Sequence, residues 1–165
     1  VISQQGQLDI LVNNAGIVIP GTVENTSLTD WQKTQAVNGE SVFLGTQAAI
    51  NVMKNRGGSI VNISSFGAEE PNLAFPTSST IRAGLSAFVK LFADKYGKDG
   101  LRMNNILPGF VDSYDVSDEI RSAIPLGREA AVSEIAKTAA FLLSEEASYI
   151  TGQNVRADGG LGRSM

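Results

Sequence analysis

Short apolar runs recur along the chain, and polar residues, glycine or proline bound each of them. Aliphatic and β-branched residues dominate these runs, which is typical of buried strands. Two serines follow the second run, and Pro108-Gly109 ends the third. The pattern predicts four strands, which lie within residues 8–16, 59–63, 101–109 and 153–157.

Between these runs, apolar residues recur every three or four positions, which is the spacing of one face of an α-helix. The clearest series runs from Ile81 through Leu85 to Tyr96, and its helix is expected to begin near Thr77. Three more helical segments are predicted: the end of a helix at 1–6, a helix over 28–56 interrupted at 36–39, and a helix over 134–144 capped by Ser133.

Strands and helices therefore alternate, which predicts an α/β fold with a parallel sheet and right-handed crossovers. The chain of 165 residues is 42% hydrophobic, enough for one soluble globular domain with a sizeable core. Residues 114–131 lack strong periodicity and contain Pro125 and Gly127. Such a segment, placed after a strand, is a candidate substrate lid.

The composition excludes several classes of function. The chain has no cysteine and no histidine, so a disulfide framework, a thiolate nucleophile, a histidine triad and the usual metal sites are not expected. A net charge of −4 without a basic cluster argues against nucleic-acid binding. No apolar run is long enough to span a membrane, and a cytoplasmic location is expected.

Two clusters of hydroxyl groups flank the junction between the second strand and the helix after it. Ser64-Ser65 end the strand, and Thr77-Ser78-Ser79 stand at the expected helix start. Ligands of parallel α/β sheets bind in the crevice beyond the strand ends. These hydroxyls are therefore either helix caps or part of a functional site.

Six motifs follow one another in the chain: Asn13-Asn14-Ala15-Gly16, Asn38, Ile60–Ser65, Ala83-Gly84-Leu85, Pro108-Gly109 and Asp158-Gly159-Gly160. In this order they resemble the short-chain dehydrogenase/reductases, from about Leu8 to Gly160. The resemblance implies a Rossmann-like, doubly wound parallel sheet with NAD or NADP as cofactor and a small-molecule carbonyl or alcohol as substrate. The glycine-rich phosphate-binding turn of that fold is not found. We therefore expect residues 1–165 to be a partial single domain whose N-terminal half is missing.

The resemblance also implies roles for single residues. Asn38 matches the asparagine that holds a water in the proton relay, and Ser65 matches the serine that steadies the substrate oxygen. The turn at residues 13–16 is expected under the adenosine side of the cofactor. The remaining cofactor-binding residues implied are Ile63, Arg82, Pro108, Gly109, Val111 and Ser113.

The catalytic Tyr-x-x-x-Lys of the family is replaced. The tyrosine is expected thirteen residues after Ser65 and the lysine four residues later, where the sequence has Ser78 and Arg82. Ala83-Gly84-Leu85 fix this register. An aliphatic hydroxyl is much harder to ionise than a phenol, and arginine keeps its charge and donors but does not pass a proton as lysine does.

Each of these motifs also has a purely structural interpretation. Asn13 to Gly16 are ordinary turn formers. Asn38 is suited, as a buried amide, to hydrogen-bond across a helix break, and Pro108-Gly109 is suited to terminate a strand. Three hypotheses therefore remain for the site: an oxidoreductase with a modified acid, a dinucleotide-binding module without turnover, or a plain helix start at residues 77–79.

Members of this family pair their long helices across two-fold axes, so a homodimer or homotetramer is expected. The helices after Asn38 and after Ser78 carry more apolar residues than one sheet face needs. The candidates for a subunit contact are Val42, Phe43, Ala49, Phe88 and Phe92.

Overall fold

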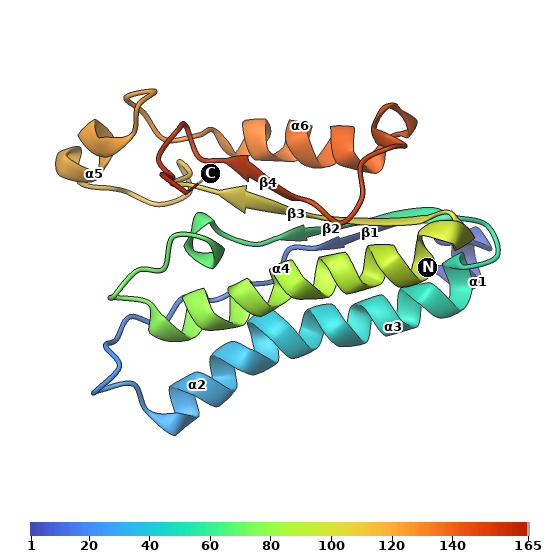
Figure 1. Ribbon diagram of the computed structural model, residues 1–165, viewed down its shortest axis with the longest axis horizontal. Coiled ribbons are helices and arrows are strands. Elements are labelled where there is room, and N and C mark those ends of the chain that lie inside the picture. Colours follow the sequence, from blue (N-terminus) through green and yellow to red (C-terminus); the bar gives the residue numbers. More distant parts are fainter. Residues whose placement is uncertain (165) are drawn as a thin grey trace.

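The computed structural model describes residues 1–164 as a parallel sheet with helices on both faces (Figure 1). The four strands pair in chain order, β1-β2-β3-β4, and every pairing is parallel. All four predicted strands are present, and the predicted α/β class is confirmed. Their bounds are β1 (Ile10–Asn13), β2 (Gly58–Ile63), β3 (Leu101–Pro108) and β4 (Asn154–Ala157).

The helices account for most of the remaining chain. α2 continues through a π-helical turn, η1, into α3, so the interruption predicted at 36–39 is a widened turn and not a break. The predicted lid contains a short helix, α5. The bounds are α1 (Ile2–Gln5), α2 (Leu28–Gln35), η1 (Ala36–Glu40), α3 (Ser41–Met53), η2 (Phe66–Ala68), α4 (Pro76–Tyr96), η3 (Gly97–Asp99), α5 (Asp118–Ala123), α6 (Val132–Leu143) and η4 (Glu145–Ala147).

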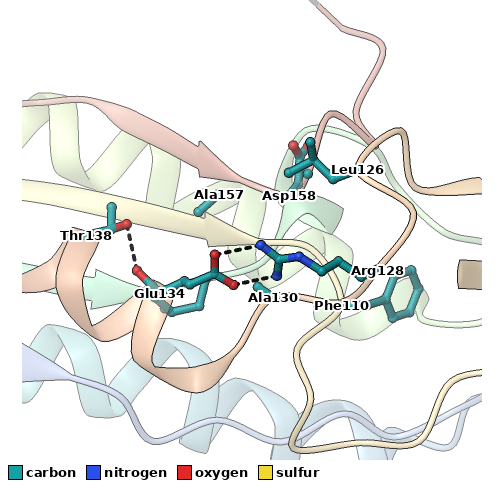
Figure 2. Close-up of a pocket in the computed structure, with 10 residues that line it drawn as sticks. Phe110, Leu126, Arg128, Ala130, Glu134, Thr138, Ala157 and Asp158 are labelled. Carbon is teal, nitrogen blue, oxygen red and sulfur yellow. Dashed lines mark hydrogen bonds and ion pairs between the residues drawn. The ribbon is translucent and has the colours of Figure 1, made fainter.

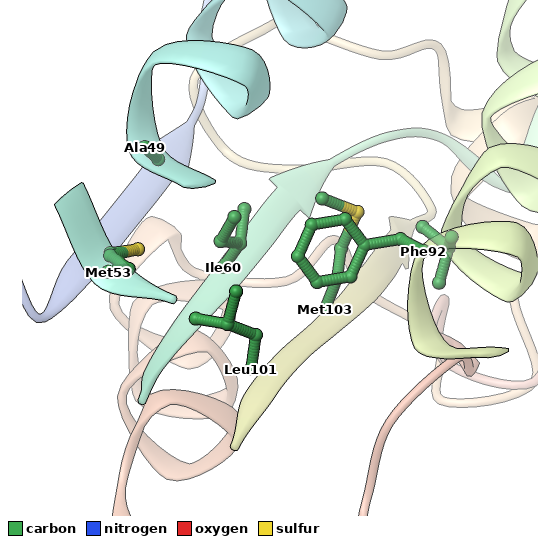
Figure 3. Packing of buried hydrophobic residues seen from close by; sticks show 7 residues of the cluster. Ala49, Met53, Ile60, Phe92, Leu101 and Met103 are labelled. Atoms are coloured by element: carbon green, nitrogen blue, oxygen red, sulfur yellow. The ribbon is translucent and has the colours of Figure 1, made fainter. Parts of the chain in front are cut away.

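Alternating residues of the central strands build a separate core on each face of the sheet. On one face Ile60 and Met103 pack against Met53 of α3 and Phe92 of α4 (Figure 3). The next residue of β2, Val61, packs with α6 on the opposite face. This alternation follows from the two-residue period of a strand.

The position of α6 corrects the prediction that every crossover is right-handed. α3 and α4 cover one face of the sheet and α6 covers the other (Figure 1), although the chain steps to the next strand in the same direction each time. A crossover on the opposite face, with the same step, has the opposite hand. The long excursion over residues 109–131 carries the chain past the strand ends to that face.

Four asparagines form a hydrogen-bonded row across the sheet, one from each strand. Asn13 Nδ2 donates to Asn62 Oδ1 at 2.8 Å, Asn62 Nδ2 to Asn105 Oδ1 at 2.9 Å, and Asn105 Nδ2 to Asn154 Oδ1 at 2.8 Å. The four residues are direct partners in the strand register. Because each amide bonds the next, this asparagine row satisfies polar groups that would otherwise be buried without partners.

α4 begins where it was expected, near Thr77, but the two predicted helix caps are wrong. α4 begins at Pro76, whose missing N–H suits the first helical position, and the hydroxyls of residues 77–79 cap nothing. α6 begins at Val132, so Ser133 lies inside it. Its first amides are instead bound by Glu134 Oε2, 2.8 Å from the Ala131 nitrogen, and Asp112 Oδ1, 3.0 Å from the Val132 nitrogen.

Three of the five residues predicted for a subunit contact are interior residues. Val42, Ala49 and Phe92 are buried within the chain itself. Phe43 remains 48% exposed and stacks at a tilt on Phe88, with ring centroids 6.1 Å apart. Within residues 1–164, no helix is both long and apolar enough to cross a membrane.

Candidate active site

Asn38 lies in the π-helical turn between α2 and α3. Its Oδ1 accepts from the Ile17 nitrogen and its Nδ2 donates to the Ile17 carbonyl oxygen, both at 2.8 Å. The residue is 1% exposed. A π-turn inserts one extra residue into a helix and is frequent at functional sites. Here it presents Asn38 to the loop after β1, so this amide ties the helix to the strand end.

Arg82 connects three of the predicted site segments. Its Nε donates to Ser78 Oγ at 3.3 Å, and its Nη1 donates to the Ile63 carbonyl oxygen at 3.1 Å. Its Nη2 lies against Gly16, where an added Cβ would be 2.6 Å from this nitrogen and 3.7 Å from Asn38 Oδ1. Burial lowers the pKa of the guanidinium. The side chain thus joins the ends of β1 and β2 to α4.

The three neighbouring hydroxyls at the start of α4 have different partners. Thr77 Oγ1 donates to Thr34 Oγ1 of α2 at 3.5 Å, and Ser78 accepts from Arg82. Ser79 Oγ accepts from the Asn72 nitrogen at 3.3 Å. All three hydroxyls are buried, and none of them caps the helix, so the interpretation of this cluster as a simple helix cap does not hold.

Ser65 begins the loop after β2. Its Oγ accepts from the Gly67 nitrogen at 3.1 Å. An added Cβ on Gly67 would be 3.5 Å from both Ser65 Oγ and Ser79 Oγ, so these two hydroxyls flank the same glycine. Ser64 is buried, and its hydroxyl has no hydrogen-bond partner among the described residues. Ser64 and Ser79 were not predicted as site residues, although the tandem serines at both places were visible in the sequence.

The loop after Ser65 is tied to the end of the chain. Arg156 Nε lies 2.6 Å from Glu69 Oε2, and Glu70 Oε1 accepts from the Arg163 nitrogen at 2.6 Å. Hydrogen bonds from the backbone and hydroxyl of Ser164, then from the Arg163 backbone, lower the pKa of Glu70. These contacts were not predicted, because they join residues that are far apart in the sequence.

The turn after β1 divides into two parts. The side chain of Asn13 belongs to the asparagine row, and its Oδ1 lies 3.1 Å from where a Cβ on Gly45 would be. Asn14, Ala15 and Gly16 are exposed. The turn therefore offers backbone and short side chains at the surface, while its first asparagine faces α3.

The residues predicted after β3 form a separate group. Pro108 is buried, Gly109 and Val111 are half-buried, and Ser113 is exposed. A Cβ on Gly109 would be 2.8 Å from the Asp158 Cα, so the close approach of β4 requires this glycine. Val111 forms an isolated bridge with Ala130. Within residues 1–164, no hydrogen bond joins this group to Arg82.

A small pocket of about 170 Å³ lies beside this group, between α6, β4 and the loop before α6 (Figure 2). Phe110, Ala157 and the Arg128–Glu134 pair line it. Arg128 donates to both carboxylate oxygens of Glu134, at 2.7 and 2.9 Å, which lowers the pKa of Glu134 to about 2. Because both charges are paired and none of the predicted residues lines this pocket, it is not the candidate active site.

The residues around Arg82 suit the ribose side of a dinucleotide. Gly16 is exposed, and the guanidinium of Arg82 and the hydroxyl of Ser78 carry polar hydrogens that can bind hydroxyl groups. Among residues 1–164, no group of histidine, cysteine, aspartate or glutamate side chains could hold a metal ion. The chemistry of the donor set is thus compatible with NAD or NADP.

A family model described as "Enoyl-(Acyl carrier protein) reductase" matches residues 1–162. The chain belongs to the short-chain dehydrogenase/reductase family. Enzymes of this family use NAD or NADP, which agrees with the predicted cofactor. A solved structure of a double mutant of a Serratia marcescens short-chain dehydrogenase/reductase superposes with a TM-score of 0.92 at 35% identity, over 98% of this chain and 69% of that one.

Curated relatives have several activities by name. Trans-4-hydroxycyclohexanecarboxylate dehydrogenase of Sinomonas cyclohexanicum is 37% identical over 96% of this chain and 62% of its own length. The 3-oxoacyl-[acyl-carrier-protein] reductase FabG of Aquifex aeolicus is 38% identical over 93% of this chain and 65% of its own length. The chain therefore spans less than two thirds of the length of these two relatives.

Proposed function

We propose that this chain carries the reaction end of an NAD(P)-dependent oxidoreductase that interconverts a carbonyl and an alcohol in a small molecule. The supporting observation is the meeting of Gly16, Ile63 and Ser78 at the Arg82 guanidinium, next to Asn38. When bound, the nicotinamide supplies or accepts the hydride. The proposal includes the cytoplasmic location expected from the sequence.

The protein groups have distinct roles in this proposal. Ser65 binds the reacting oxygen of the substrate, and Ser78 is the modified acid, with its Oγ held by Arg82 Nε at 3.3 Å. Because neither serine nor arginine titrates near neutral pH, the proton exchanges with water near Asn38. Pro108, Gly109, Val111 and Ser113 contact the nicotinamide side, and Ile63 and residues 13–16 the ribose and adenosine.

Restoring the family's acid–base pair tests this assignment. The double variant Ser78→Tyr with Arg82→Lys should raise carbonyl reduction by about 10²–10⁴-fold, the typical contribution of a positioned general acid. Each single variant should gain much less, because the phenol needs the lysine to tune it. Cofactor affinity, measured by nicotinamide fluorescence, should change little.

A matched control places the same change elsewhere. Arg102→Lys replaces a half-buried arginine far from the candidate site and should not raise turnover. If the double variant folds and binds cofactor but reduces nothing across a broad carbonyl panel, Ser78 is not at the chemical centre.

A second candidate function is a dinucleotide-binding module without turnover. It is favoured by the position of the three tyrosines, the side chains best able to replace the missing acid. Tyr96 stacks on Phe92 at the far end of α4, with ring centroids 5.0 Å apart, whereas Tyr114 and Tyr149 are 77% and 102% exposed. Tight cofactor binding without any NAD(P)H oxidation would support this alternative.

The proposed assembly is a homodimer or homotetramer built on α3 and α4. After Val42, Ala49 and Phe92 are assigned to the interior, the Phe43–Phe88 pair and exposed Leu44 and Leu91 remain for the contact. Phe88→Glu should give smaller species by light scattering, because a buried carboxylate opposes association. Tyr114→Glu, in the loop before α5, should leave the size unchanged.

A further inference from the structure

The turn after Ser65, residues 66–70, is bonded to the rest of the chain through two carboxylates. Among residues 1–164, every hydrogen bond that links this turn to a segment beyond Ser65 ends on the side chain of Glu69 or Glu70. The backbone nitrogens of these two residues donate to the carbonyl oxygen at the start of the turn, at 3.0 and 2.9 Å. The Gly67 nitrogen donates to Ser65 Oγ at 3.1 Å. A displacement of either carboxylate therefore reaches the amide that orients the Ser65 hydroxyl.

Arg156 links this turn to the sheet. It lies in β4, where it is the register partner of Leu107 in β3. Its Nε donates to Glu69 Oε2 at 2.6 Å, its Nη2 donates to Ser164 Oγ at 2.6 Å, and its Nη1 donates to the Ser164 carbonyl oxygen. The side chains of Arg156 and Glu69 are 29% and 26% exposed, so water screens this ion pair less than a pair at the surface. One arginine thus attaches both the turn and Ser164 to a strand.

The motif Asp158-Gly159-Gly160, which has no part in the proposed reaction, folds the chain back toward the same turn. Asp158 Oδ1 accepts from the Gly160 nitrogen and Oδ2 from the Gly162 nitrogen, both at 2.9 Å. Gly159 and Gly160 have φ angles of 66° and 85°, a region that favours glycine because it lacks a Cβ. The segment 158–164 therefore reverses direction at its start.

Glu70 binds the end of this segment. Its Oε1 accepts from the Arg163 nitrogen at 2.6 Å and also from the Ser164 nitrogen. Hydrogen bonds to an ionised group are stronger than those between neutral groups. Together with the Arg156–Glu69 pair, they give the turn charge-assisted attachments at two adjacent residues, which fix its direction as well as its place.

We propose that Arg156 and the segment 158–164 hold the turn after Ser65 in the conformation that directs the Ser65 hydroxyl to the substrate oxygen. Arg156, Asp158 and Glu70 are then positioning residues, because they act through the turn. Ser65 Oγ accepts from Gly67, so its own hydrogen is available for the substrate. The role of Ser65 rests on the proposed function, whereas the attachment of the turn to the segment requires neither cofactor nor turnover.

Amide hydrogen exchange, followed by mass spectrometry on the full chain without cofactor, tests the attachment. In Arg156→Gln, the amides of residues 66–70 should exchange about ten-fold faster or more, because the turn opens more often without its anchor. Asp158→Ala should have the same effect, since two backbone amides of the segment lose their acceptors. The double variant Glu69→Arg with Arg156→Glu should exchange more slowly than either single variant, because the ion pair reforms with its charges reversed.

Steady-state kinetics test the consequence for the reaction, with NADH or NADPH and the carbonyl that the chain reduces fastest. Arg156→Gln should lower kcat by about 10–100-fold, since a displacement of about 1 Å at a reacting group has an effect of this size. The KM for the cofactor should not change, because Ser65 acts on the substrate oxygen. A residue that merely stabilised the fold would change neither constant below the melting temperature.

Arg102 provides the matched control. It is half-buried like Arg156, lies on the neighbouring strand, and donates to the carbonyl oxygens of Leu142 at 2.7 Å and Ser144 at 2.9 Å. Arg102→Gln should lower the melting temperature and leave exchange in the turn unchanged. Glu70→Ala, which removes the acceptor of two backbone amides, serves if Arg156→Gln does not fold.

Three outcomes would overturn the proposal. These are unchanged exchange of the turn in Arg156→Gln and Glu70→Ala, an equal increase in Arg102→Gln, and an unchanged kcat in an Arg156→Gln protein whose turn exchanges faster. A protein that reduces no carbonyl contradicts the proposed function alone, because the exchange result does not depend on turnover. The two proposals therefore fail separately.

Discussion

The asparagine row and the surroundings of Arg82 are two buried polar regions of one sheet, and they differ in how fully they are bonded. In the row, Asn62 and Asn105 each donate to one neighbour and accept from another. Around Arg82, Nη2 has no partner among the described residues and the guanidinium has no opposite charge. The row is complete without a ligand, and the Arg82 region is not.

This difference separates buried polar groups that stabilise the fold from buried polar groups that are available to bind a ligand. A saturated buried network fixes strand register and contributes rigidity, because every alternative register leaves amides unpaired. An unsaturated one reduces stability unless a ligand completes it, which is the usual trade-off at functional sites. Substitutions in the row should therefore change stability, and substitutions near Arg82 should change binding.

The largest effect is expected for Asn62→Ala. The change leaves the amide of Asn13 and the Oδ1 of Asn105 without partners, which should lower the free energy of unfolding by about 2–5 kcal/mol. Urea unfolding measures it. Asn154→Ala, at the end of the row, removes one acceptor from a half-buried position and should cost about 1 kcal/mol. Equal costs at both positions would show that the row does not act as one network.

Two glycine substitutions distinguish the regions more sharply. Gly109→Ala places a Cβ 2.8 Å from the Cα of Asp158, and the clash with backbone should cost about 1–3 kcal/mol of stability. Gly16→Ala places its Cβ 2.6 Å from Arg82 Nη2, the end of a flexible side chain, so stability should change by less than about 0.5 kcal/mol.

The two variants should differ in the property that changes: ligand binding in Gly16→Ala and stability in Gly109→Ala. Gly16→Ala moves the guanidinium and should weaken binding of the cofactor, measured by calorimetry. Gly109→Ala should show its effect as a lowered melting temperature. If Gly16→Ala strongly lowered the stability of the protein, the contrast between a binding region and a structural region would not hold.

The smallest effect is a surface one, far from both regions. Hydrogen bonds from Arg128 hold the pKa of Glu134 at about 2, and those from Arg121 hold the pKa of Glu129 at about 2, below the ordinary value of 4.5. A depressed folded-state pKa stabilises above the unfolded-state value, and this contribution is lost as the pH falls from 4.5 toward 2. Melting temperatures should decline over this range, and Arg128→Gln should make the decline shallower, less so at high salt.

The sequence was sufficient to predict the strands, because short apolar runs bounded by turn formers fit few other secondary structures. It was insufficient for the asparagine row, in which the side chain of Asn13 bonds Asn62. Only the register of neighbouring strands shows that the asparagines face one another. Their recurrence in every predicted strand was the signal that was overlooked.

The two predicted helix caps were wrong for a related reason. Serine and threonine are strong local capping signals, but the N-terminal amide of α6 is bound by Asp112, twenty residues earlier. Likewise Thr77 bonds to Thr34 of another helix and caps nothing. Asp112 and Thr34 lie far away in the sequence from the groups they bind, and no local pattern shows them, whereas Glu134, three residues after Ala131, is a local capping residue.

The π-turn at Ala36–Glu40 has a consequence for insertions and deletions in this chain. A π-turn holds one residue more than an α-turn, so deleting a single residue from it allows a regular α-helix to form through the segment. The π-turn and the α-turn that would replace it both close one full turn, so α2 and α3 would stay nearly in phase. The deletion would remove the widened turn that presents Asn38 to Ile17, while the backbone stays helical. The site is thus sensitive to a change in length that the fold itself tolerates.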